Sequence, residues 1–453
     1  MLLITFRNVV FSYFFNLKLH LFFAFILLNS TNLHSQTTSI PDSTFEQALI
    51  SLNIDTNGLN GNILNSDAAS VATLFIGNIG VHDLSGIEAF KNLKYLFVNN
   101  NHLTTLDLCF NPYLEVLDAD NNNLTTLNLA SNQALRGVYI SNNNLNTLDV
   151  SNNSQLENLY CSLNNISVLD VSANGNLKDL RCYFNNLSSI NLTSNLNLED
   201  LFISENNLNT LDVSANTALK TLSCDNNSLS VIDVSSNASL RYLSCSNNNL
   251  NALDLSDNND LKRILCNNNN ITSIELTNIE DLFLLYVQNN QIQSLDISNN
   301  PDVKYINAAN NVLNNIDIRN GNNHRISQFL VTDNPSLTCI FVDDTSASYL
   351  NNWEVGSSCN FVADEGECQT LSSQEVIDVD FRMYPNPATT VVNVSLNVPT
   401  AKLVLYNVRG QFLFEKEITL GENSLNVSSL SSGLYIATII TEGNTITKKL
   451  VIQ

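Results

Sequence analysis

The sequence predicts a mainly β protein, in which a solenoid of stacked turns is followed by a small β-sandwich domain. Two observations predict the solenoid: aliphatic residues recur every 21 residues, and an Asn follows each of them after eight residues. A unit of this length cannot bury its own apolar face, so the copies must stack on one another. The leading aliphatic residues are Leu93, Leu114, Leu135, Leu156, Leu177, Leu198, Leu219, Leu240, Leu261, Leu282 and Val303.

A single turn, residues 156–176, contains two segments of alternating apolar and polar residues. One surrounds Tyr160, and the other runs from Ser167 to Ser172. Such alternation is typical of extended chain, and the bends between the segments carry Asn, which tolerates left-handed backbone. We expect the inward Asn of each turn, such as Asn164, to form a ladder that satisfies buried backbone groups. The coil is therefore expected to carry parallel sheets on two sides.

Residues 1–35 are predicted to be a signal peptide, with cleavage before Gln36. The apolar run of residues 19–28 is short for a membrane span, which needs about 20 apolar residues. An uncleaved anchor is the alternative. Residues 36–70 should cap the solenoid, because Ser43 and Glu46 read as a capping box that opens a helix. The apolar face of this helix is expected to comprise Phe45, Ala48, Leu49 and Leu52.

The remaining boundaries follow from changes in the repeat. The solenoid is assigned to residues 71–345, its C-terminal cap to 346–368 and a polar linker to 369–380. Residues 381–453 lack the repeat and consist of short alternating stretches separated by Gly and Asn turns, which predicts the β-sandwich.

The cysteines fall into two groups. Those inside the repeat occupy a position that other turns fill with Val, Ala or Ile, so we expect buried, unreactive thiols: Cys161, Cys182, Cys224, Cys245 and Cys266. Cys339, Cys359 and Cys368 follow the repeats, and in an oxidising compartment two of these three are expected to form a disulfide.

The repeated pattern LxxLxVxxNxLxxLDVSxN over residues 71 to about 345 resembles the leucine-rich repeat family in its short, internalin-like bacterial form. The opening residues 40–49 resemble the start of secreted leucine-rich repeat proteins of the Bacteroidetes type. The resemblance implies a right-handed curved solenoid that recognises proteins on its concave sheet. Since the second half-turn here also reads as a strand, we expect a flatter coil than the eukaryotic type.

The C-terminal residues resemble the sorting domain of the type IX secretion system. The resemblance rests on the YPNPA, GLY and KKL motifs, represented by Tyr384, Pro385, Asn386, Pro387, Gly433, Leu434, Tyr435, Lys448 and Lys449. It implies a Gram-negative source in the Bacteroidetes and interaction with the type IX machinery. It further implies passage across the outer membrane and removal of the tail. The product would then be released or attached to lipopolysaccharide on the cell surface.

Aromatic residues at outward positions of the first strand predict a recognition face, because Tyr buries much area at low entropic cost. Cross-strand stacking that only stabilises the sheet is the alternative. The candidate ligand-binding residues are Tyr95, Phe97, Tyr139, Tyr160, Arg181, Tyr183, Phe202, Tyr242, Tyr286 and Tyr305.

A row of acidic residues marks the second strand. Calcium binding to this row is one interpretation, and a solvated face that prevents aggregation is the other; no other cofactor is expected. The row consists of Asp107, Asn128, Asp149, Asp170, Asn191, Asp212, Asp233, Asp254, Glu275, Asp296 and Asp317.

Composition and motifs narrow the function. A net charge of −23 argues against nucleic-acid binding, which needs Lys and Arg to displace counterions. His82, His102 and His324 have no plausible nucleophile or paired carboxylate nearby, so no enzyme is predicted. We expect a secreted or cell-surface recognition module for a protein or glycan, without a transmembrane span after leader removal. The alternative is a structural surface-layer or adhesion-assembly component without a discrete ligand.

Overall fold

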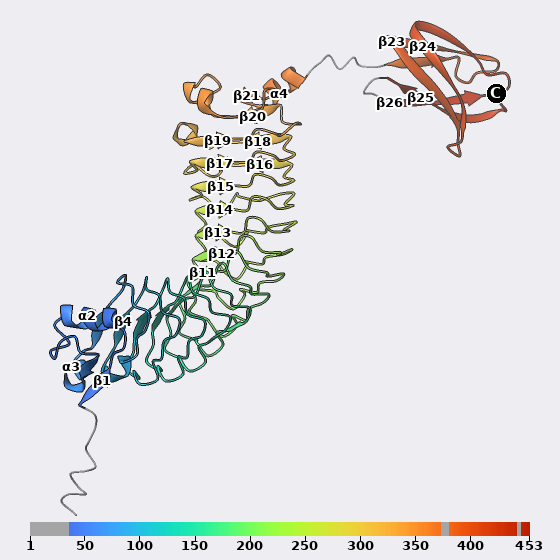
Figure 1. Cartoon of the computed structure of the whole chain (residues 1–453). Coiled ribbons are helices and arrows are strands. Elements are labelled where there is room, and N and C mark those ends of the chain that lie inside the picture. The colour runs from blue at the N-terminus through green and yellow to red at the C-terminus, as the bar shows by residue number, and fades with distance from the viewer. Residues whose placement is uncertain (1–35, 373–379, 442–444) are drawn as a thin grey trace, which may run out of the picture. The chain divides into compact units, whose positions relative to one another are not determined.

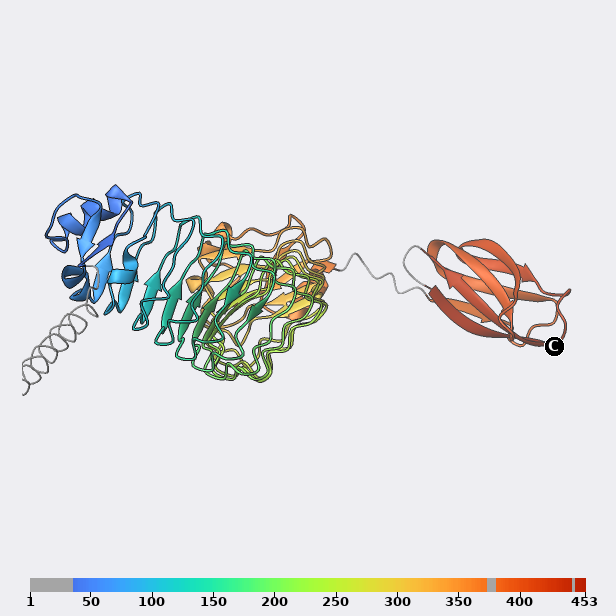
Figure 2. The same cartoon turned by 60° about the horizontal axis from the view of Figure 1, so that its bottom comes forward.

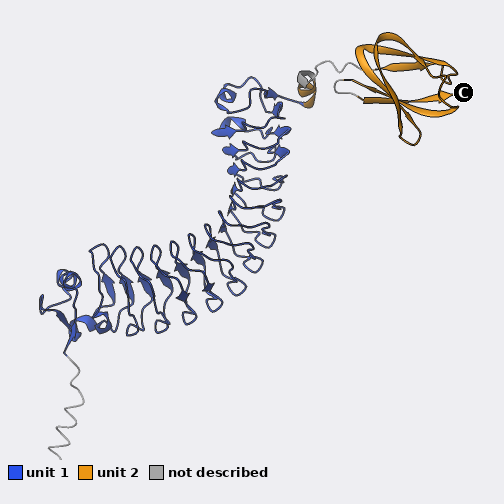
Figure 3. Ribbon diagram, turned by 45° about the vertical axis from the view of Figure 1, so that its right-hand side comes forward, with its two compact units in different colours: residues 1–364 blue, residues 365–453 orange. Residues whose placement is uncertain are grey.

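The computed structural model describes residues 36–372, 380–441 and 445–453, so the predicted signal peptide lies outside the described residues. The chain divides into two compact units, one ending at Asp364 and the other comprising Glu365–Gln453 (Figure 3). The first unit is the solenoid with its caps, and the second is an antiparallel β domain, as expected from the sequence. Among the described residues, every helix is too short or too polar to traverse a bilayer.

One parallel sheet of 13 strands runs through the solenoid and lines the inner side of its curve (Figures 1 and 3). We call this sheet the inner sheet. Neighbouring strands pair without slippage: Leu180 lies opposite Leu159 on one side and Leu201 on the other. The inner sheet comprises β3 (Thr73–Phe75), β4 (Tyr95–Phe97), β5 (Val116–Asp118), β6 (Gly137–Tyr139), β8 (Asn158–Tyr160), β10 (Asp179–Arg181), β11 (Asp200–Phe202), β12 (Thr221–Ser223), β13 (Tyr242–Ser244), β14 (Arg263–Leu265), β15 (Leu284–Tyr286), β17 (Tyr305–Asn307) and β19 (Gln328–Leu330).

The second predicted sheet forms only in part. Short strands pair at two places on the opposite side of the coil, and isolated bridges such as Asp212 to Asp233 connect some turns elsewhere. In the turns between, this side has the same sequence pattern but no assigned strand. Seen from below, the turns of the C-terminal half superpose closely (Figure 2). The strands are β7 (Leu148–Asp149), β9 (Leu169–Asp170), β16 (Ser294–Asp296), β18 (Asn315–Asp317), β20 (Cys339–Phe341) and β21 (Asn360–Val362).

Both ends of the solenoid are capped by short elements. At the N-terminal end, β1 (Thr37–Ser39) pairs with β2 (Asn62–Leu64) beside α2 (Ser43–Ser51) and α3 (Asn65–Ala69). The 3-10 helix η1 (Ile87–Ala89) follows in the first turn. The C-terminal end contains η2 (Asn323–Arg325) and η3 (Ser348–Asn352), and α4 (Glu365–Ser372) belongs to the second unit.

Helix α2 corrects two details of the predicted cap. Its N-cap is Asp42 rather than Ser43, because the Asp42 carboxylate accepts hydrogen bonds from the amides of Thr44 and Phe45. Glu46 does not close a capping box; its buried carboxylate accepts from three consecutive amides, residues 60–62. Leu52 leaves the buried face and is 44% exposed, because the helix has already ended.

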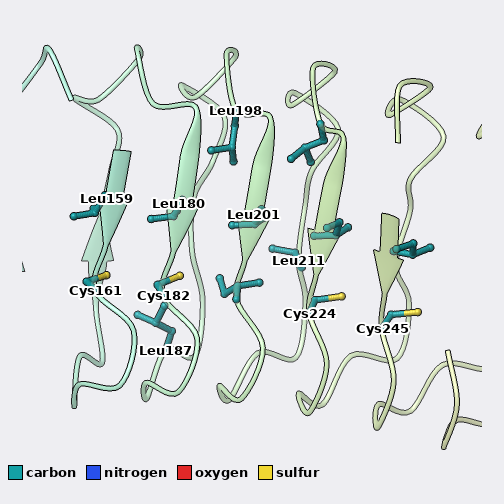
Figure 4. Close-up of a cluster of buried hydrophobic side chains, with 14 of the residues drawn as sticks. Leu159, Cys161, Leu180, Cys182, Leu187, Leu198, Leu201, Leu211, Cys224 and Cys245 are labelled. Carbon is teal, nitrogen blue, oxygen red and sulfur yellow. The ribbon is translucent and has the colours of Figure 1, made fainter. Parts of the chain in front are cut away.

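The core is one continuous apolar column. The aliphatic residues that recur at the inward positions of each turn are buried, and each such Leu stabilises the fold by roughly 1.5–3 kcal/mol. Figure 4 shows Cys161 and Cys182 directed into this column beside Leu159 and Leu180. Burial raises the pKa of the Cys161 thiol to about 12, which suppresses the reactive thiolate. The repeat cysteines are therefore core residues.

The remaining cysteines differ in state. Cys339 and Cys368 are disulfide-bonded, and Cys359 is a free thiol whose Sγ lies 3.2 Å from the Leu337 carbonyl oxygen. Cys109 is free and exposed.

The second unit has five antiparallel strands around its own core. The long strand β23 (Val391–Asn407) pairs with β22 (Phe381–Tyr384), β24 (Phe412–Asn426) and β25 (Gly433–Ile440), and β26 (Thr445–Ile452) pairs with β25. A shift in register between Leu396 and Thr400 divides the pairing of β23 with β24. Phe381, Leu403 and Leu450 are buried between the strands.

Candidate binding face on the inner sheet

The ladder of inward Asn residues holds the backbone of this face. The Oδ1 of Asn185 accepts from the Ile166 amide at 2.9 Å, and its Nδ2 donates to the Cys161 and Cys182 carbonyls. Equivalent bonds recur in successive turns, as at Asn206. The bend after each strand is thus fixed by side-chain amides in place of regular backbone pairing. This gives the outward side chains a rigid base.

All of the candidate aromatic residues lie on the inner sheet or directly after its strands, and each is half-buried. They form separate groups rather than one stripe. At the N-terminal end, Phe97 stacks on Phe75 with ring centroids 4.6 Å apart. Near the other end, Tyr305 packs edge-on against Phe283 at 5.3 Å, and the Tyr286 hydroxyl donates to Gln328.

The central cluster consists of Tyr139, Tyr160, Asp179, Arg181 and Phe202. The Arg181 guanidinium lies over the Tyr160 ring at 4.2 Å and over the Phe202 ring at 4.9 Å. Asp179 accepts from Arg181 Nη2 at 2.9 Å and from the Tyr160 hydroxyl at 2.6 Å. Tyr139 meets Tyr160 edge-to-face at 4.8 Å. The cluster is therefore ordered before any ligand arrives, which lowers the entropic cost of binding.

Electrostatics around this cluster are set by partial burial. Burial, followed by the hydrogen bond to Asp179, raises the pKa of the Tyr160 phenol far above its usual value. Burial also raises the pKa of Asp120 to about 6, with the carboxylate of Asp118 adding to the effect. The Tyr160 hydroxyl is therefore a neutral hydrogen-bond donor.

Next to the central cluster lies a groove of about 460 Å³. Its lining includes the aromatic side chains Tyr183, Phe184, Phe202 and Tyr242, the side chain of Leu265, and a set of hydroxyls around Asp225. The Asp225 carboxylate accepts from Ser223 Oγ at 3.0 Å and from the hydroxyls of Ser204 and Ser244. The groove therefore combines aromatic side chains with a negatively charged, hydroxyl-rich stretch.

Two exposed apolar residues beside this face were missed in the sequence. Leu163 is 43% exposed and Phe184 is 49% exposed. Both occupy the residue directly before the ladder Asn, where most turns carry a second Asn. The break in that Asn-Asn pattern is the signal that could have identified them.

On the opposite side of the coil, carboxylates of the acidic row accept hydrogen bonds from nearby backbone amides. Asp149, Asp170 and Asp212 each accept from the amide two residues further along, at 2.9 Å. The Ser at that position lowers the pKa of each carboxyl, first through a hydrogen bond from its side chain and then through the bond from its backbone amide. Within the described ranges, three or more His, Cys, Asp or Glu side chains nowhere converge as a metal site would require.

The sorting motifs come together in the second unit. The Asn386 side chain donates to the Lys449 carbonyl and accepts from the Val451 amide, both at 2.8 Å. Lys448 Nζ lies over the Phe381 ring at 4.8 Å and donates to Asp380. The YPNP and KKL motifs, far apart in sequence, therefore form one patch of the β domain.

The comparisons with known proteins agree with both units. Residues 382–453 match the model of the secretion system C-terminal sorting domain. No curated protein matches the chain in sequence. The domain match identifies a type IX sorting tail, implies an origin in the Bacteroidetes, and indicates export to a secreted or cell-surface location.

Solved leucine-rich repeat structures, bacterial internalins among them, share the fold of the solenoid. The functional domain of InlJ from Listeria monocytogenes, described as including a cysteine ladder, is 21% identical with a TM-score of 0.61, and the match covers 92% of this chain and 99% of that one. An internalin from the same species, inlF, is 19% identical, with a TM-score of 0.53 and coverage of 70% and 100%. A leucine-rich repeat protein of Leptospira interrogans is 23% identical, with a TM-score of 0.52 and coverage of 63% and 78%. The solenoid is thus an internalin-like leucine-rich repeat fold.

Proposed function

We propose that the exported protein recognises another protein through the inner sheet, with the central cluster as the principal contact. The observation that carries the proposal is the arrangement of Arg181 between two aromatic rings on a rigid sheet. Aromatic and Arg side chains dominate the binding energy of many protein interfaces, particularly where they are already ordered. The sorting tail supports the proposal, because export places this face in contact with extracellular molecules.

Binding of a glycan to the same face, release into the medium and attachment to lipopolysaccharide are finer possibilities within this proposal. The aromatic groups suit sugar rings as well as side chains. A glycan array and a protein pull-down on the same purified chain distinguish the two ligand classes.

The structural alternative is a surface-layer or adhesion-assembly component that needs no discrete ligand. The cross-strand contact between Tyr139 and Tyr160 favours it, because such pairs stabilise sheets by themselves. In the recognition function the exposed part of each ring contacts a partner, whereas in the structural function the rings only stabilise the sheet.

The test replaces Tyr139, Tyr160 and Phe202 together by Ser. A matched control replaces Val168 and Val231 by Ser; these side chains are 71% and 68% exposed, outside the inner sheet. We expect the triple variant to lose partner capture and cell adhesion while its circular dichroism spectrum is retained, and the control to keep both activities. Unchanged capture and adhesion by a folded triple variant would favour the structural alternative.

A further inference from the structure

The backbone before each ladder Asn adopts the left-handed conformation throughout the solenoid. The amide of this residue donates to the next turn, as from Leu163 to the Tyr183 carbonyl at 2.9 Å and from Phe184 to the Ser204 carbonyl at 3.0 Å. Since this ladder repeats in each turn, stacking imposes the conformation whichever side chain is present. The cost then depends on the residue type: Asn and Asp tolerate positive φ, whereas bulky residues are strained there.

Three consecutive turns break the rule at this position. Leu163 (φ 55°), Phe184 (φ 52°) and Glu205 (φ 55°) stand where the flanking turns of the repeat carry Asn. The remaining turns have Asn100, Asn121, Asn142, Asn226, Asn247, Asn268, Asn289, Asn310 and Asp333, all with positive φ.

Side-chain hydrogen bonds join some of the neighbouring Asn residues at this position, on both sides of the three exceptions. Asn142 Nδ2 donates to Asn121 Oδ1 at 2.7 Å on one side of the gap. On the other side, Asn268 donates to Asn247 at 2.7 Å and Asn289 to Asn268 at 2.6 Å. Leu163 and Phe184 cannot make such bonds, and they remain 43% and 49% exposed. These residues therefore have a strained backbone conformation and no side-chain hydrogen bond at this position, and they are not buried in exchange.

Strained, exposed apolar residues that gather at one place indicate a functional constraint. Phe184 contacts Tyr183 edge-on at 6.0 Å, and both line the groove. Glu205 lines the same groove and has no ion-pair partner among the described residues. The groove lining, given by side chains from Tyr183 to Leu265, contains no Lys or Arg.

We propose that Leu163, Phe184 and Glu205 are the specificity-determining residues of the binding face, and that they receive a polypeptide segment in which an apolar side chain adjoins a Lys or Arg. The apolar side chain lies against Phe184 and Leu163, and its cationic neighbour lies against Glu205 and Asp225. Charge complementarity favours this partner, since both charged residues of the groove are acidic in a chain of net charge −23. The inference rests on the proposed protein-binding function and names the segment it recognises.

The proposal predicts opposite effects on stability and binding. The Leu163→Asn and Phe184→Asn double variant restores the residue of the other turns, so the full chain should melt about 2 °C higher or more. Its binding should be at least tenfold weaker. A matched control, Asn121→Leu with Asn142→Leu, introduces the same strain outside the groove, so it should melt lower and bind normally.

The probe is a phage-displayed library of short random peptides, selected on the wild-type full chain, with the best peptide synthesised for fluorescence anisotropy. We expect enrichment of aromatic or aliphatic residues next to Lys or Arg. Added NaCl should weaken the binding of this peptide to wild type several-fold more than its binding to Glu205→Gln.

Several results would overturn the inference. These are equal peptide affinity for wild type and the Asn double variant, a lower melting temperature of that variant, enrichment of acidic peptides, or no enrichment at all. Suppose that a selected peptide binds the Asn double variant as tightly as wild type but does not bind the Tyr139, Tyr160 and Phe202 triple variant. The proposed function then survives and this inference fails. If a glycan array alone gives binding, the protein-binding function itself fails.

Discussion

The solenoid contains two rows of buried Asn, which allow a paired test within a single turn. The first row is the ladder of inward Asn, represented by Asn185, and the second, ten residues later, is represented by Asn195. Asn185 and Asn195 are both buried, and the Nδ2 of each donates to two backbone carbonyls at 3.2 Å or less. They differ in the other atom of the amide. The Oδ1 of Asn185 accepts the Ile166 amide at 2.9 Å, whereas the Oδ1 of Asn195 is buried without a hydrogen-bond partner. Replacing each by Leu, of similar size, therefore removes different interactions.

The expected magnitudes follow from what each substitution leaves behind. Asn185→Leu leaves the Ile166 amide buried without an acceptor, and an unsatisfied buried group costs about 1–3 kcal/mol. With the loss of two amide donors, we expect about 3 kcal/mol of destabilisation. Asn195→Leu leaves the Val171 and Asn174 carbonyls bonded to backbone amides. It also removes an unpaired buried oxygen, so its effect should stay within about 1 kcal/mol.

The chain itself supplies a precedent for the second substitution. The turn that begins at Leu261 carries Ile279 at the position equivalent to Asn195, and the Ile279 amide still donates to the Leu276 carbonyl at 3.0 Å. No turn of the regular repeat replaces the Asn of the first row.

The assay is urea denaturation of the intact mature chain, followed by circular dichroism and by the fluorescence of Trp353. Asn185→Leu should lower the free energy of unfolding well beyond the change caused by Asn195→Leu. Equal destabilisation by the two variants, or a larger loss at Asn195, would refute the assignment of the first row as the one that fixes the bend.

Three further predictions test the structure elsewhere. Asp120 has a pKa of about 6 in the folded state, against an ordinary value near 3.9. The folded state therefore binds this proton more tightly than the unfolded state does. The resulting contribution to stability is fully present below about pH 4 and is lost as the pH rises through 6. The melting temperature of Asp120→Asn should therefore lie a few degrees above that of the wild type at about pH 7.5 and equal it at about pH 4. A calorimetric difference between the two proteins that does not change with pH would contradict this expectation. Iodoacetamide should label the exposed Cys109 in the native chain but the buried Cys161 and Cys182 only in urea, and peptide mass spectrometry would show the difference. Mass spectrometry of the exported protein should find no peptides from residues 382–453, and an intact tail on secreted protein would argue against removal of the sorting domain.

The inner sheet combines structural and recognition properties in the same side chains. Arg181 is held by Asp179 and two aromatic rings, so its truncation would disturb both the sheet and any ligand contact. Leu163 and Phe184 separate the two roles, because their replacement by Asn should improve the fold while harming the interface. They are therefore the more informative positions for mutagenesis.

The sequence alone determined the periodic part of this protein. A buried aliphatic at a fixed spacing and an inward Asn after eight residues leave a stack as the means of hiding the apolar face, so the inner sheet and the buried Cys161 could be predicted. The sorting domain could also be predicted, because residues 384–387 and 448–449 form short contiguous motifs.

Only the tertiary structure decided what is not periodic. Asp42 caps α2 instead of Ser43 because of where the chain enters the helix, and Arg181 reaches two rings that lie one turn away on either side. The strain at Leu163 and Phe184 arises because neighbouring turns impose a left-handed backbone on whichever residue stands there. Each residue type has its own preferred backbone conformation, but contacts between turns decide whether the residue adopts that conformation.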